Sequence, residues 1–326
     1  MDNYTFRFLT KKDTDEINTL FKASFEVAVK DRFVNWKYFK NPEGNALLAG
    51  AFHKNKLVGF GAMIPEKLNV FDKEEIIFKC TDLMTHPLHQ RKGLSKSINK
   101  LLVEETLKTA PAFLYTLCSK VSTKSFVRNN WLFLNQVTNF FKPLVIVKMH
   151  NLLRNDDFSN IEVYDSIQHH LDDYSFKTDS SNISQHKTPN YLKWRTANPN
   201  FSYTLICSYD NNKRVDGYLI FSISNNNLLN IIDLESSSNS SKIERKLIRY
   251  VESIVVKKKY KGVLILTVKN SPLYKFSKKN NYLINPFKRG PLKTILDVNI
   301  YLNTIDLSKL NIPYAWDING LAYDDI

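Results

Sequence analysis

The stretch HPLHQRKGLSKSINKLL (residues 86–102) joins an apolar run to a helical pattern through a basic turn that holds one glycine. Apolar residues recur at helical spacing from Leu94 to Leu102, so this helix can pack one face on a sheet. A strand that enters a helix through such a turn leaves N–H groups unpaired at the helix N-terminus, where the helix dipole favours negative charge. Gly93 lets a ligand approach the backbone because it has no Cβ. The stretch therefore predicts an anion site, and the alternative is a solvated turn with a flexible glycine.

The side chains of this turn favour an anion but match no nucleotide-binding motif. Arg91, Lys92 and Lys96 add positive charge, and Ser95 offers a hydroxyl that can cap free N–H groups. No second glycine stands at the spacing of GxxxxGK[ST] or GxGxxG. Nucleoside triphosphates and dinucleotides are therefore poor candidates for the ligand.

The first 150 residues alternate strand and helix patterns. Predicted strands cover residues 6–10, 46–53, 56–70, 75–86, 113–119, 131–137 and 141–149, and predicted helices cover 13–29, 94–108 and 124–128. This alternation predicts an α/β (α+β) fold in which a mixed central sheet is flanked by helices.

The second half of the chain repeats this plan in weaker form. Four pairs of segments match in the same order: WKYFKNP (36–42) with KWRTANP (193–199), KLVGF (56–60) with RVDGY (214–218), CTDLM (80–84) with IIDLE (231–235), and FVRNNWLF (126–133) with FSKKNNYLI (276–284). Duplication of one α/β unit explains this order better than chance does. We therefore predict two tandem domains, residues 1–150 and 151–326, with the polar segment 176–190 as a linker or a long surface loop.

The two copies differ at the turn. The second copy has DLESSSNSSKIERK (233–246), which contains no glycine and no Gln-Arg-Lys-Gly sequence. Only the N-terminal copy is expected to bind an anion.

Composition limits the partners of the chain. The formal charge of +14, from 46 basic and 32 acidic residues, favours anionic partners such as nucleic acid, coenzymes or sugar nucleotides. No zinc-finger, RRM or helix-turn-helix signature is present, so nucleic acid is not expected. No window is apolar enough for a membrane span, and the N-terminus lacks the apolar core of a signal peptide, so we expect a cytoplasmic protein. The oligomeric state is left open.

Metal sites and disulfides are not expected. Cys80, Cys118 and Cys207 are an odd number without a CxxC pair, and each lies in an apolar run. His169 and His170 are adjacent, so on a helix they would point apart and form a poor metal site.

The turn and its flanks resemble the acetyl-coenzyme A signature of the GNAT-fold N-acyltransferases, in which a strand is followed by Gln/Arg-x-x-Gly-x-Gly/Ala and a helix. Gln90, Gly93 and Ser95 occupy the three marked positions, and Ser95 replaces one small residue by another. The resemblance covers residues 1–150 and implies the GNAT fold, acyl-coenzyme A as co-substrate and no metal.

The wider arrangement is similar to the tandem GNAT-fold acyltransferases of bacterial surface-polysaccharide pathways. FVNWKYFKNPEG (33–44), LVGFGAMIP (57–65) and TDLMTHP (81–87), with a degenerate copy behind them, carry this likeness. It implies transfer of an acetyl or hydroxybutanoyl-type group to the amino group of a dTDP-linked amino-dideoxyhexose, such as dTDP-3-amino-3,6-dideoxyhexose. The alternatives are a GNAT enzyme that acylates a protein, a peptide or another small amine, and a catalytically silent basic module.

The resemblance also implies which residues hold coenzyme A. The strand before the turn, with Leu83, Met84 and Thr85, would pair with the pantetheine arm, and one of its N–H groups would polarise the thioester carbonyl. The backbone N–H groups of Arg91, Lys92, Gly93, Leu94, Ser95 and Lys96 would bind the pyrophosphate. Ser119 or Ser122 lies near the place where the family often has an Asn that contacts the coenzyme.

Asp82 is the predicted catalytic base. It is an isolated carboxylate in an apolar, small-residue strand, where burial favours its acting as a proton acceptor. Pairing with a lysine or a backbone group is the structural alternative. His86 and His89 are the other candidates for proton transfer. Phe126 stands where many members of the family have a Tyr, which leaves the general acid unassigned.

Two segments that contain Trp are predicted to bind the acceptor. Stacking by tryptophan and positive charge for a diphosphate would come from Trp36, Lys37, Tyr38 and Asn41 in the first copy and from Lys193, Trp194 and Arg195 in the second. The alternative is that these aromatic side chains pack each helix on its sheet. A cleft between the copies is the natural place for a sugar nucleotide.

Overall fold

The computed structural model describes residues 3–25, 29–30, 32–71, 73–177, 183–237, 240–269, 271–284, 296–303 and 316–317. The N-terminal half contains β1 (Tyr4–Phe8), η1 (Lys11–Asp13), α1 (Thr14–Phe25), α2 (Phe33–Phe39), β2 (Leu47–His53), β3 (Lys56–Val70), β4 (Lys73–Thr85), η2 (Pro87–His89), α3 (Leu94–Thr106), η3 (Leu107–Thr109), β5 (Phe113–Ser119), α4 (Lys120–Val127), β6 (Leu132–Pro143) and α5 (Leu144–Leu152).

The C-terminal half contains β7 (Ile161–Tyr164), β8 (Ile183–Gln185), α6 (Pro189–Thr196), β9 (Tyr203–Tyr209), β10 (Val215–Ile223), β11 (Leu229–Ser236), α7 (Ser241–Lys258), β12 (Gly262–Val268), α8 (Pro272–Lys279), β13 (Leu283–Ile284), β14 (Leu296–Leu302) and β15 (Trp316–Asp317). No helix in the described ranges is long and apolar enough to cross a membrane.

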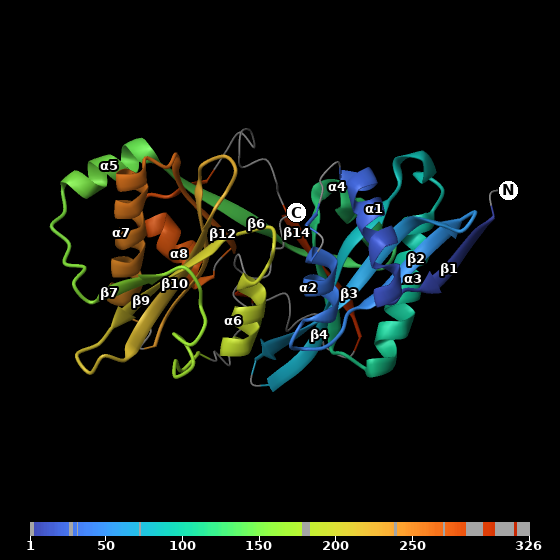
Figure 1. Ribbon diagram of the computed structural model, residues 1–326, viewed down its shortest axis with the longest axis horizontal. Helices are drawn as coiled ribbons and strands as arrows, with labels where there is room; N and C mark the ends of the chain where they lie inside the picture. Colours follow the sequence, from blue (N-terminus) through green and yellow to red (C-terminus); the bar gives the residue numbers. More distant parts are fainter. Residues whose placement is uncertain are drawn as a thin grey trace.

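Each half contains a mixed sheet flanked by helices, as predicted, and β6 joins the two sheets into one hydrogen-bonded path of strands. The order along this path is β1-β2-β3-β4-β5-β14-β6-β12-β11-β10-β9-β7, and β6 crosses the middle of the molecule (Figure 1). In the N-terminal half, α3 covers one face, and its apolar residues pack with Trp131 and Phe126. Helices α1 and α2 cover the other face in a second cluster, which includes Phe21 and Phe60.

The two halves exchange strands. β14, near the end of the chain, lies between β5 and the first part of β6. The second part of β6 passes into the other half, where it pairs with β12 and β13. Each half is thus completed by a strand from the other half. The division into domains at residue 150 remains a prediction, and the exchange means that a cut there would remove one strand from each sheet.

A buried ion pair fixes the exchanged part of β6. Lys142 Nζ lies 2.6 Å from Glu252 Oε1 on α7, and both side chains are almost fully buried. Arg154 binds the other oxygen of Glu252 at 2.8 Å, and the Tyr282 hydroxyl donates to Glu252 Oε1 at 3.0 Å. Burial lowers the pKa of Lys142, and the neighbouring Glu252 opposes this shift. Satisfying the Glu252 carboxylate with three donors limits the cost of burying it.

The repeat that the sequence predicts is present in the structure. α2, β2, β3, β4, α3, β5, α4 and β6 recur in the same order as α6, β9, β10, β11, α7, β12, α8 and β13. The Asn-Pro pairs make the same turn in both copies: Asn41 Oδ1 accepts from the Glu43 N–H at 3.1 Å, and Asn198 Oδ1 accepts from the Asn200 N–H at 3.0 Å. These are Asx turns, which explains why both copies keep Asn at this point.

KLVGF and RVDGY share a glycine, and the same packing contact explains why glycine occupies this position in both copies. A Cβ on Gly59 would lie 2.9 Å from Ile98 Cδ1 of α3, and a Cβ on Gly217 would lie 2.6 Å from Ile243 Cγ2 of α7. Both distances are shorter than carbon atoms tolerate without a shift. The glycine therefore lets the crossover helix pack directly on its sheet.

Two segments differ from their predicted form. Residues 183–185, within the predicted linker 176–190, form β8, which pairs with β3 and buries Ile183; residues 178–182 lie outside the described ranges. The predicted strand 141–149 ends at Pro143 and continues as helix α5. Its β-branched residues favour a strand, but Val147 is fully buried in a cluster that also contains apolar residues of α7, so tertiary packing decides.

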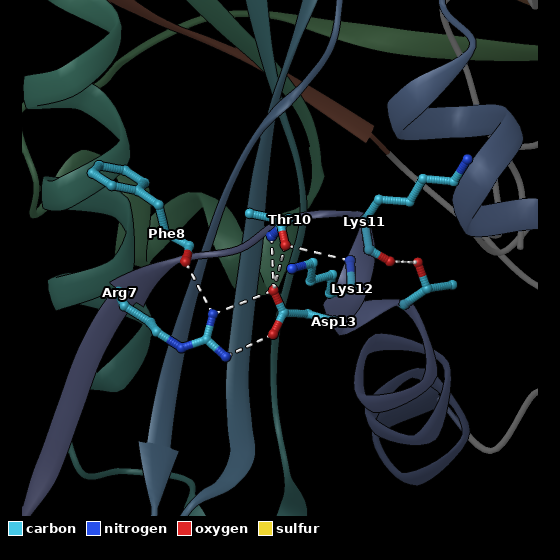
Figure 2. Close-up of polar contacts among 7 residues, drawn as sticks. Arg7, Phe8, Thr10, Lys11, Lys12 and Asp13 are labelled. Atoms are coloured by element: carbon cyan, nitrogen blue, oxygen red, sulfur yellow. Dashed lines mark hydrogen bonds and ion pairs between the residues drawn. The ribbon is translucent and has the colours of Figure 1, made fainter.

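The corner between β1 and α1 is closed by a polar cap (Figure 2). Asp13 accepts from the Thr10 N–H at 2.7 Å while Thr10 Oγ1 accepts from the Lys12 N–H at 3.3 Å. The Arg7 guanidinium binds both oxygens of Asp13, at 2.6 and 3.2 Å. This hydrogen bond from Arg7 is the main cause that lowers the pKa of Asp13.

We predict that Gly217→Val destabilises the protein by about 1–3 kcal/mol, because the added side chain overpacks the contact between β10 and α7. The measurement is the free energy of unfolding from urea denaturation. Ile243→Ala should remove the clashing Cγ2 atom. The Gly217→Val and Ile243→Ala double variant should therefore lose less stability than the sum of the two single variants. Strict additivity would show that Ile243 is not the obstacle.

Candidate active site

β4 and β5 separate just before the turn that the sequence predicts to bind an anion. Their parallel pairing ends at Cys80 and Thr116, while β4 continues to Thr85 and β5 to Ser119. β4 still pairs with β3 there, through Met84 with Phe60 and Thr85 with Gly59. The edge of β4 that faces β5 is therefore open over Leu83, Met84 and Thr85, where an extended ligand can pair with the backbone.

A β-bulge opens this gap. Asp82 and Leu83 together lie opposite Gly61, because the register shifts between Phe60 and Ala62. Asp82 has a φ of +53°, which a residue other than glycine rarely adopts. A bulge bends its strand and increases the local twist. The strand therefore turns away from β5 at Asp82.

The Asp82 carboxylate is held from α2. Lys37 Nζ lies 2.8 Å from Asp82 Oδ2, and the Tyr38 hydroxyl donates to the same oxygen at 2.7 Å. The side chains of Lys37 and Asp82 are 1% and 6% exposed. Among the described contacts, the second oxygen, Oδ1, receives no bond. The structure thus shows the lysine pairing that was the structural alternative, and it leaves one carboxylate oxygen for a proton.

The turn after β4 presents the start of α3 without a side-chain cap. Gly93 is the N-cap of α3, with φ of +78° and no side-chain hydrogen bond. Its carbonyl accepts from the N–H groups of Lys96 and Ser97, so the amides of Gly93, Leu94 and Ser95 precede the first bond of the helix. A Cβ on Gly93 would meet no atom within 4 Å, so the space beside it is open. This geometry fits a pyrophosphate at a helix N-terminus.

The remaining side chains of the turn lie as follows. The loop residues Gln90, Arg91 and Lys92 and the helix residue Lys96 are exposed. Ser95 does not cap the helix as expected; its hydroxyl lies 3.1 Å from Thr85 Oγ1 and ties the start of α3 to the end of β4.

The second copy closes the corresponding helix start with its own side chains. β11 and β12 also separate, since their parallel pairing ends at Ile231 and Ile265. Ser240, however, caps α7 by accepting from the Ile243 N–H at 3.5 Å. Glu244 lies in the first turn and accepts from Ser236 Oγ at 3.2 Å, and burial raises the pKa of its carboxyl. A capped helix start with a carboxylate repels an anion, so only the first copy fits one.

A cavity of about 290 Å³ lies between α3 and the end of α4. It begins at Lys96, next to the turn, and two further cations, Lys100 and Arg128, line it. Its remaining lining residues are Asn99, Val103, Glu104, Asn129, Asn130 and Tyr301. The sequence did not predict Lys100, Arg128 or Tyr301 as site residues. Arg128 and Tyr301 are far from α3 in sequence, and only the folded chain brings them to it. Lys100 could have been found, because it lies one helical turn after Lys96.

The other predicted donor-site residues have local partners. His86 Nδ1 accepts from the Leu88 N–H at 3.3 Å, and His89 Nδ1 lies 3.0 Å from the Tyr4 hydroxyl. Ser119 is the N-cap of α4 and accepts from the Ser122 N–H at 3.3 Å, so both serines lie at the end of β5 beside the gap. Among the described residues, no group of three His, Cys, Asp or Glu side chains could hold a metal ion.

Two more donor-side residues are buried. Phe126 packs edge-on against Trp131, with ring centroids 5.0 Å apart, so it fills the core beneath α4. Burial raises the pKa of the Cys80 thiol to about 12, which makes it an unreactive part of the strand next to Asp82.

The two tryptophans among the predicted acceptor residues form a contact between the two copies. Trp36 and Trp194 stack, with ring centroids 5.3 Å apart. The Trp36 indole N–H donates to the Trp194 backbone carbonyl at 2.6 Å, and the Trp194 indole N–H donates to the Trp36 backbone carbonyl at 3.0 Å. One face of each ring is thus occupied by the other ring, and this contact joins α2 to α6.

The neighbours of the tryptophans are also engaged. Asn41 donates to the Pro65 carbonyl at 2.7 Å, and Lys193 pairs with Asp172 at 2.8 Å. Arg195 is buried and donates to the Tyr203 hydroxyl at 3.3 Å. The structure therefore brings Lys37 and Tyr38 to Asp82 and places Trp36, Trp194 and Arg195 at the junction between α2 and α6. Asn41 and Lys193 bond within their own copies.

A second Lys–Asp–Tyr group, which sequence reasoning did not find, lies in the C-terminal half. Lys187 Nζ lies 2.8 Å from Asp233 Oδ1 and 2.9 Å from Glu235 Oε2, and the Tyr218 hydroxyl donates to Asp233 Oδ2 at 2.6 Å. Asp233 occupies the position of Asp82 in the repeat, and this match of CTDLM with IIDLE was the available signal. The carboxylates raise the pKa of Lys187 in spite of its burial.

Comparison with known proteins agrees with this geometry. Residues 5–122 match the acetyltransferase (GNAT) domain. A probable N-acyltransferase from Enterococcus faecalis V583 superposes with a TM-score of 0.70 at 11% identity, over 93% of this chain and 73% of its own. A GCN5-related N-acetyltransferase from Anabaena variabilis ATCC 29413 gives a TM-score of 0.65 at 10% identity, over 92% and 73%.

A tandem GNAT protein from the clavulanic acid biosynthesis pathway gives a TM-score of 0.63 at 9% identity, over 91% of this chain and 98% of its own. No curated protein matches the sequence. The solved structures show the fold. The range that matches the GNAT domain, residues 5–122, includes the open gap between β4 and β5 and the uncapped start of α3. The chain therefore carries a GNAT acetyltransferase domain on a tandem GNAT fold, and it is an acyl-CoA-dependent N-acyltransferase.

Proposed function

We propose that the protein transfers an acetyl or hydroxybutanoyl-type group from acyl-coenzyme A to the amino group of a nucleotide-linked amino-dideoxy sugar, for surface polysaccharide biosynthesis. The observation that carries the transfer is the gap between β4 and β5, which ends at the uncapped start of α3. The alternative acceptor is a protein, a peptide or another small amine.

On the donor side, the open edge of Leu83, Met84 and Thr85 would bind the pantetheine arm, and the amides from Arg91 to Lys96 would bind the pyrophosphate. The cavity between α3 and α4 extends this site, because Lys96 belongs to both. Lys100 and Arg128 there can pair with a further phosphate group, so we assign the cavity to the nucleotide end of the co-substrate.

For the chemistry, Asp82 is the proposed base. Its Oδ1 atom takes one proton from the acceptor ammonium, and the free amine then attacks the thioester carbonyl carbon. The new C–N bond forms as the C–S bond breaks, and the sulfur leaves with the electron pair as a thiolate. The nitrogen loses its second proton as it becomes an amide, and this proton converts the thiolate to free coenzyme A thiol. A backbone N–H among residues 83–85 stabilises the negative charge on the carbonyl oxygen. Lys37 and Tyr38 hold Oδ2 and so orient Oδ1.

On the acceptor side, two features support a small anionic substrate. The chain carries a formal charge of +14, and its second copy, which lacks an anion-binding helix start, is free to shape the acceptor site. The tandem arrangement and its resemblance to enzymes that act on dTDP-amino-dideoxyhexoses support the sugar nucleotide over a peptide.

The function is tested by a screen in which the protein is mixed with acetyl- or 3-hydroxybutanoyl-coenzyme A and a panel of dTDP-amino-dideoxyhexoses, a lysine peptide and simple amines. Release of free thiol reports turnover, and mass spectrometry identifies the acylated product. We expect acylation of at least one sugar nucleotide with a higher kcat/KM than any peptide. Turnover with peptides or amines alone would replace the sugar assignment by the alternative.

We predict that Asp82→Asn lowers kcat by roughly 10²–10⁴-fold, because the variant cannot accept the proton. Asp233→Asn is the matched control, since it makes the same change in the copy without a donor site, and its kcat should stay within about twofold of the wild type. Acyl-coenzyme A affinity is measured in parallel by calorimetry. If Asp82→Asn and Lys37→Met both weaken this affinity while kcat is kept, Asp82 shapes the bulge and is not the base.

We predict that Arg128→Ala raises KM for acyl-coenzyme A by roughly tenfold, the equivalent of one lost charged contact. KM for acyl-pantetheine, which lacks the nucleotide, should not change. Lys124→Ala provides the control, because Lys124 is exposed on the same helix outside the cavity. If Arg128→Ala raised KM equally for acyl-coenzyme A and acyl-pantetheine, the cavity would not be the binding site of the nucleotide.

A further inference from the structure

Helix α5 carries an apolar surface that nothing in the described part of the chain covers. Val145, Met149, Leu152 and Leu153 are 64%, 60%, 86% and 85% exposed. Their spacing places them along one side of α5 and its C-cap, and we refer to these four residues as the α5 stripe. Figure 1 shows α5 at the rim of the molecule, at the end opposite β1.

The stripe is not needed to hold α5 in place. The opposite side of the helix is already packed, since Val147 is fully buried and Leu144 joins the same core cluster. The Leu144 N–H also donates to the Lys261 carbonyl at 2.9 Å, which fixes the start of the helix. Exposed apolar side chains that contribute no packing indicate a contact surface.

A group of lysines lies at the corner where α5 begins. Lys257 and Lys258 end α7, Lys259 is its C-cap, and Lys261 precedes β12; all four are exposed. The Leu144 hydrogen bond and the pairing of Gly262 with Pro143 bring this lysine corner to the first turn of α5. In the described part of the chain, no ion pair involves any of the four.

The acidic groups nearby are largely neutralised. Glu252, beneath α5, is buried and paired with Lys142 and Arg154. Asp156 is paired with Arg249 at 2.7 Å. Asp157 is exposed and keeps its charge, because hydrogen bonds from the Ser159 N–H and hydroxyl lower its pKa, so it is the one acidic group named here without a basic partner among the described ion pairs. Lys148, on α5 itself, is exposed. The surface around the stripe is therefore apolar and positively charged.

We propose that the α5 stripe and the lysine corner dock this enzyme on an anionic lipid bilayer. Apolar side chains on one side of a surface helix insert at the level of the headgroups, and lysines beside them add attraction to anionic lipids. A nine-residue helix is too short to span a bilayer, which takes about 20 residues.

A second copy of the chain fits this surface less well. A helix of nine residues is roughly 14 Å long, so its one exposed side is far smaller than the roughly 800 Å² per partner that stable interfaces bury. Two copies that met here would also bring their lysine corners together, and like charges repel. The charge thus favours an anionic surface over self-association.

The test is co-sedimentation of the full chain with large vesicles of phosphatidylcholine alone or with 30% phosphatidylglycerol, as about one lipid in three is then anionic. We expect binding to the anionic vesicles and at least tenfold weaker binding to the neutral ones. Replacing Leu152 and Leu153 by Asp, or Lys257, Lys258 and Lys259 by Gln, should each weaken the binding by at least fivefold. Circular dichroism melting verifies that each variant is folded.

Matched controls lie at the other end of the molecule. Phe6→Asp changes an exposed apolar residue of β1, and replacing Lys11, Lys12 and Lys22 by Gln removes three exposed lysines. Both should bind like the wild type. Absence of binding to anionic vesicles would overturn the proposal, and so would equal loss in controls and test variants. Analytical ultracentrifugation of the wild type would reveal a dimer if a second copy covers this surface. A dimer that dissociates in the Leu152→Asp and Leu153→Asp variant, together with no binding to vesicles, would identify a second copy as the partner instead.

Discussion

The buried contact of Asp82 with Lys37 and Tyr38 is the interaction on which the active site depends. Asp82 adopts a left-handed backbone conformation that costs of the order of 1 kcal/mol or more for a residue other than glycine. The ion pair and the tyrosine hydroxyl hold the side chain in place and offset this cost. The bulge is thereby stabilised, and it separates β4 from β5. One contact therefore shapes the donor gap and also orients the proposed base.

The comparison of the two copies shows which parts of this arrangement belong to the fold and which to the donor site. The second copy keeps the separated strands and a buried aspartate with a lysine and a tyrosine, supplied from other positions in the repeat. The backbone at Asp233 does not enter the left-handed region. The decisive change is at the helix start, where Ser240 and Glu244 replace an uncapped Gly93. The two copies therefore differ at the helix start in local polar side chains and in the backbone at the buried aspartate.

Much of the donor half could be predicted because its signals are local. The predicted strands 56–70 and 113–119 have the observed bounds, since their apolar residues lie in one uninterrupted stretch of chain. The start of α3 was marked by Gly93 and the bases around it. These features depend on residues that are near each other in sequence, so periodicity and turn chemistry suffice.

The features that could not be predicted depend on distant parts of the chain. β14, residues 296–302, pairs with strands of the N-terminal sheet. No local sequence pattern predicts such an exchange of strands. Lys37 was assigned to the acceptor because its pairing with Asp82 spans 45 residues of sequence. The helix α5 was predicted as a strand, because its β-branched residues favour one until packing on α7 is known.

The second copy contributes to the active site through the junction of the two tryptophans. Trp36 precedes Lys37 and Tyr38 on α2, and its indole N–H and backbone carbonyl are both bonded to Trp194. α2 is therefore fixed from the C-terminal half at the residue next to the two that hold Asp82. The exchanged strands prevent the halves from separating, since each sheet contains a strand of the other. The second copy, whose helix start is capped, is in this way a rigid support for the first copy. This gives a physical reason for keeping both copies in one chain.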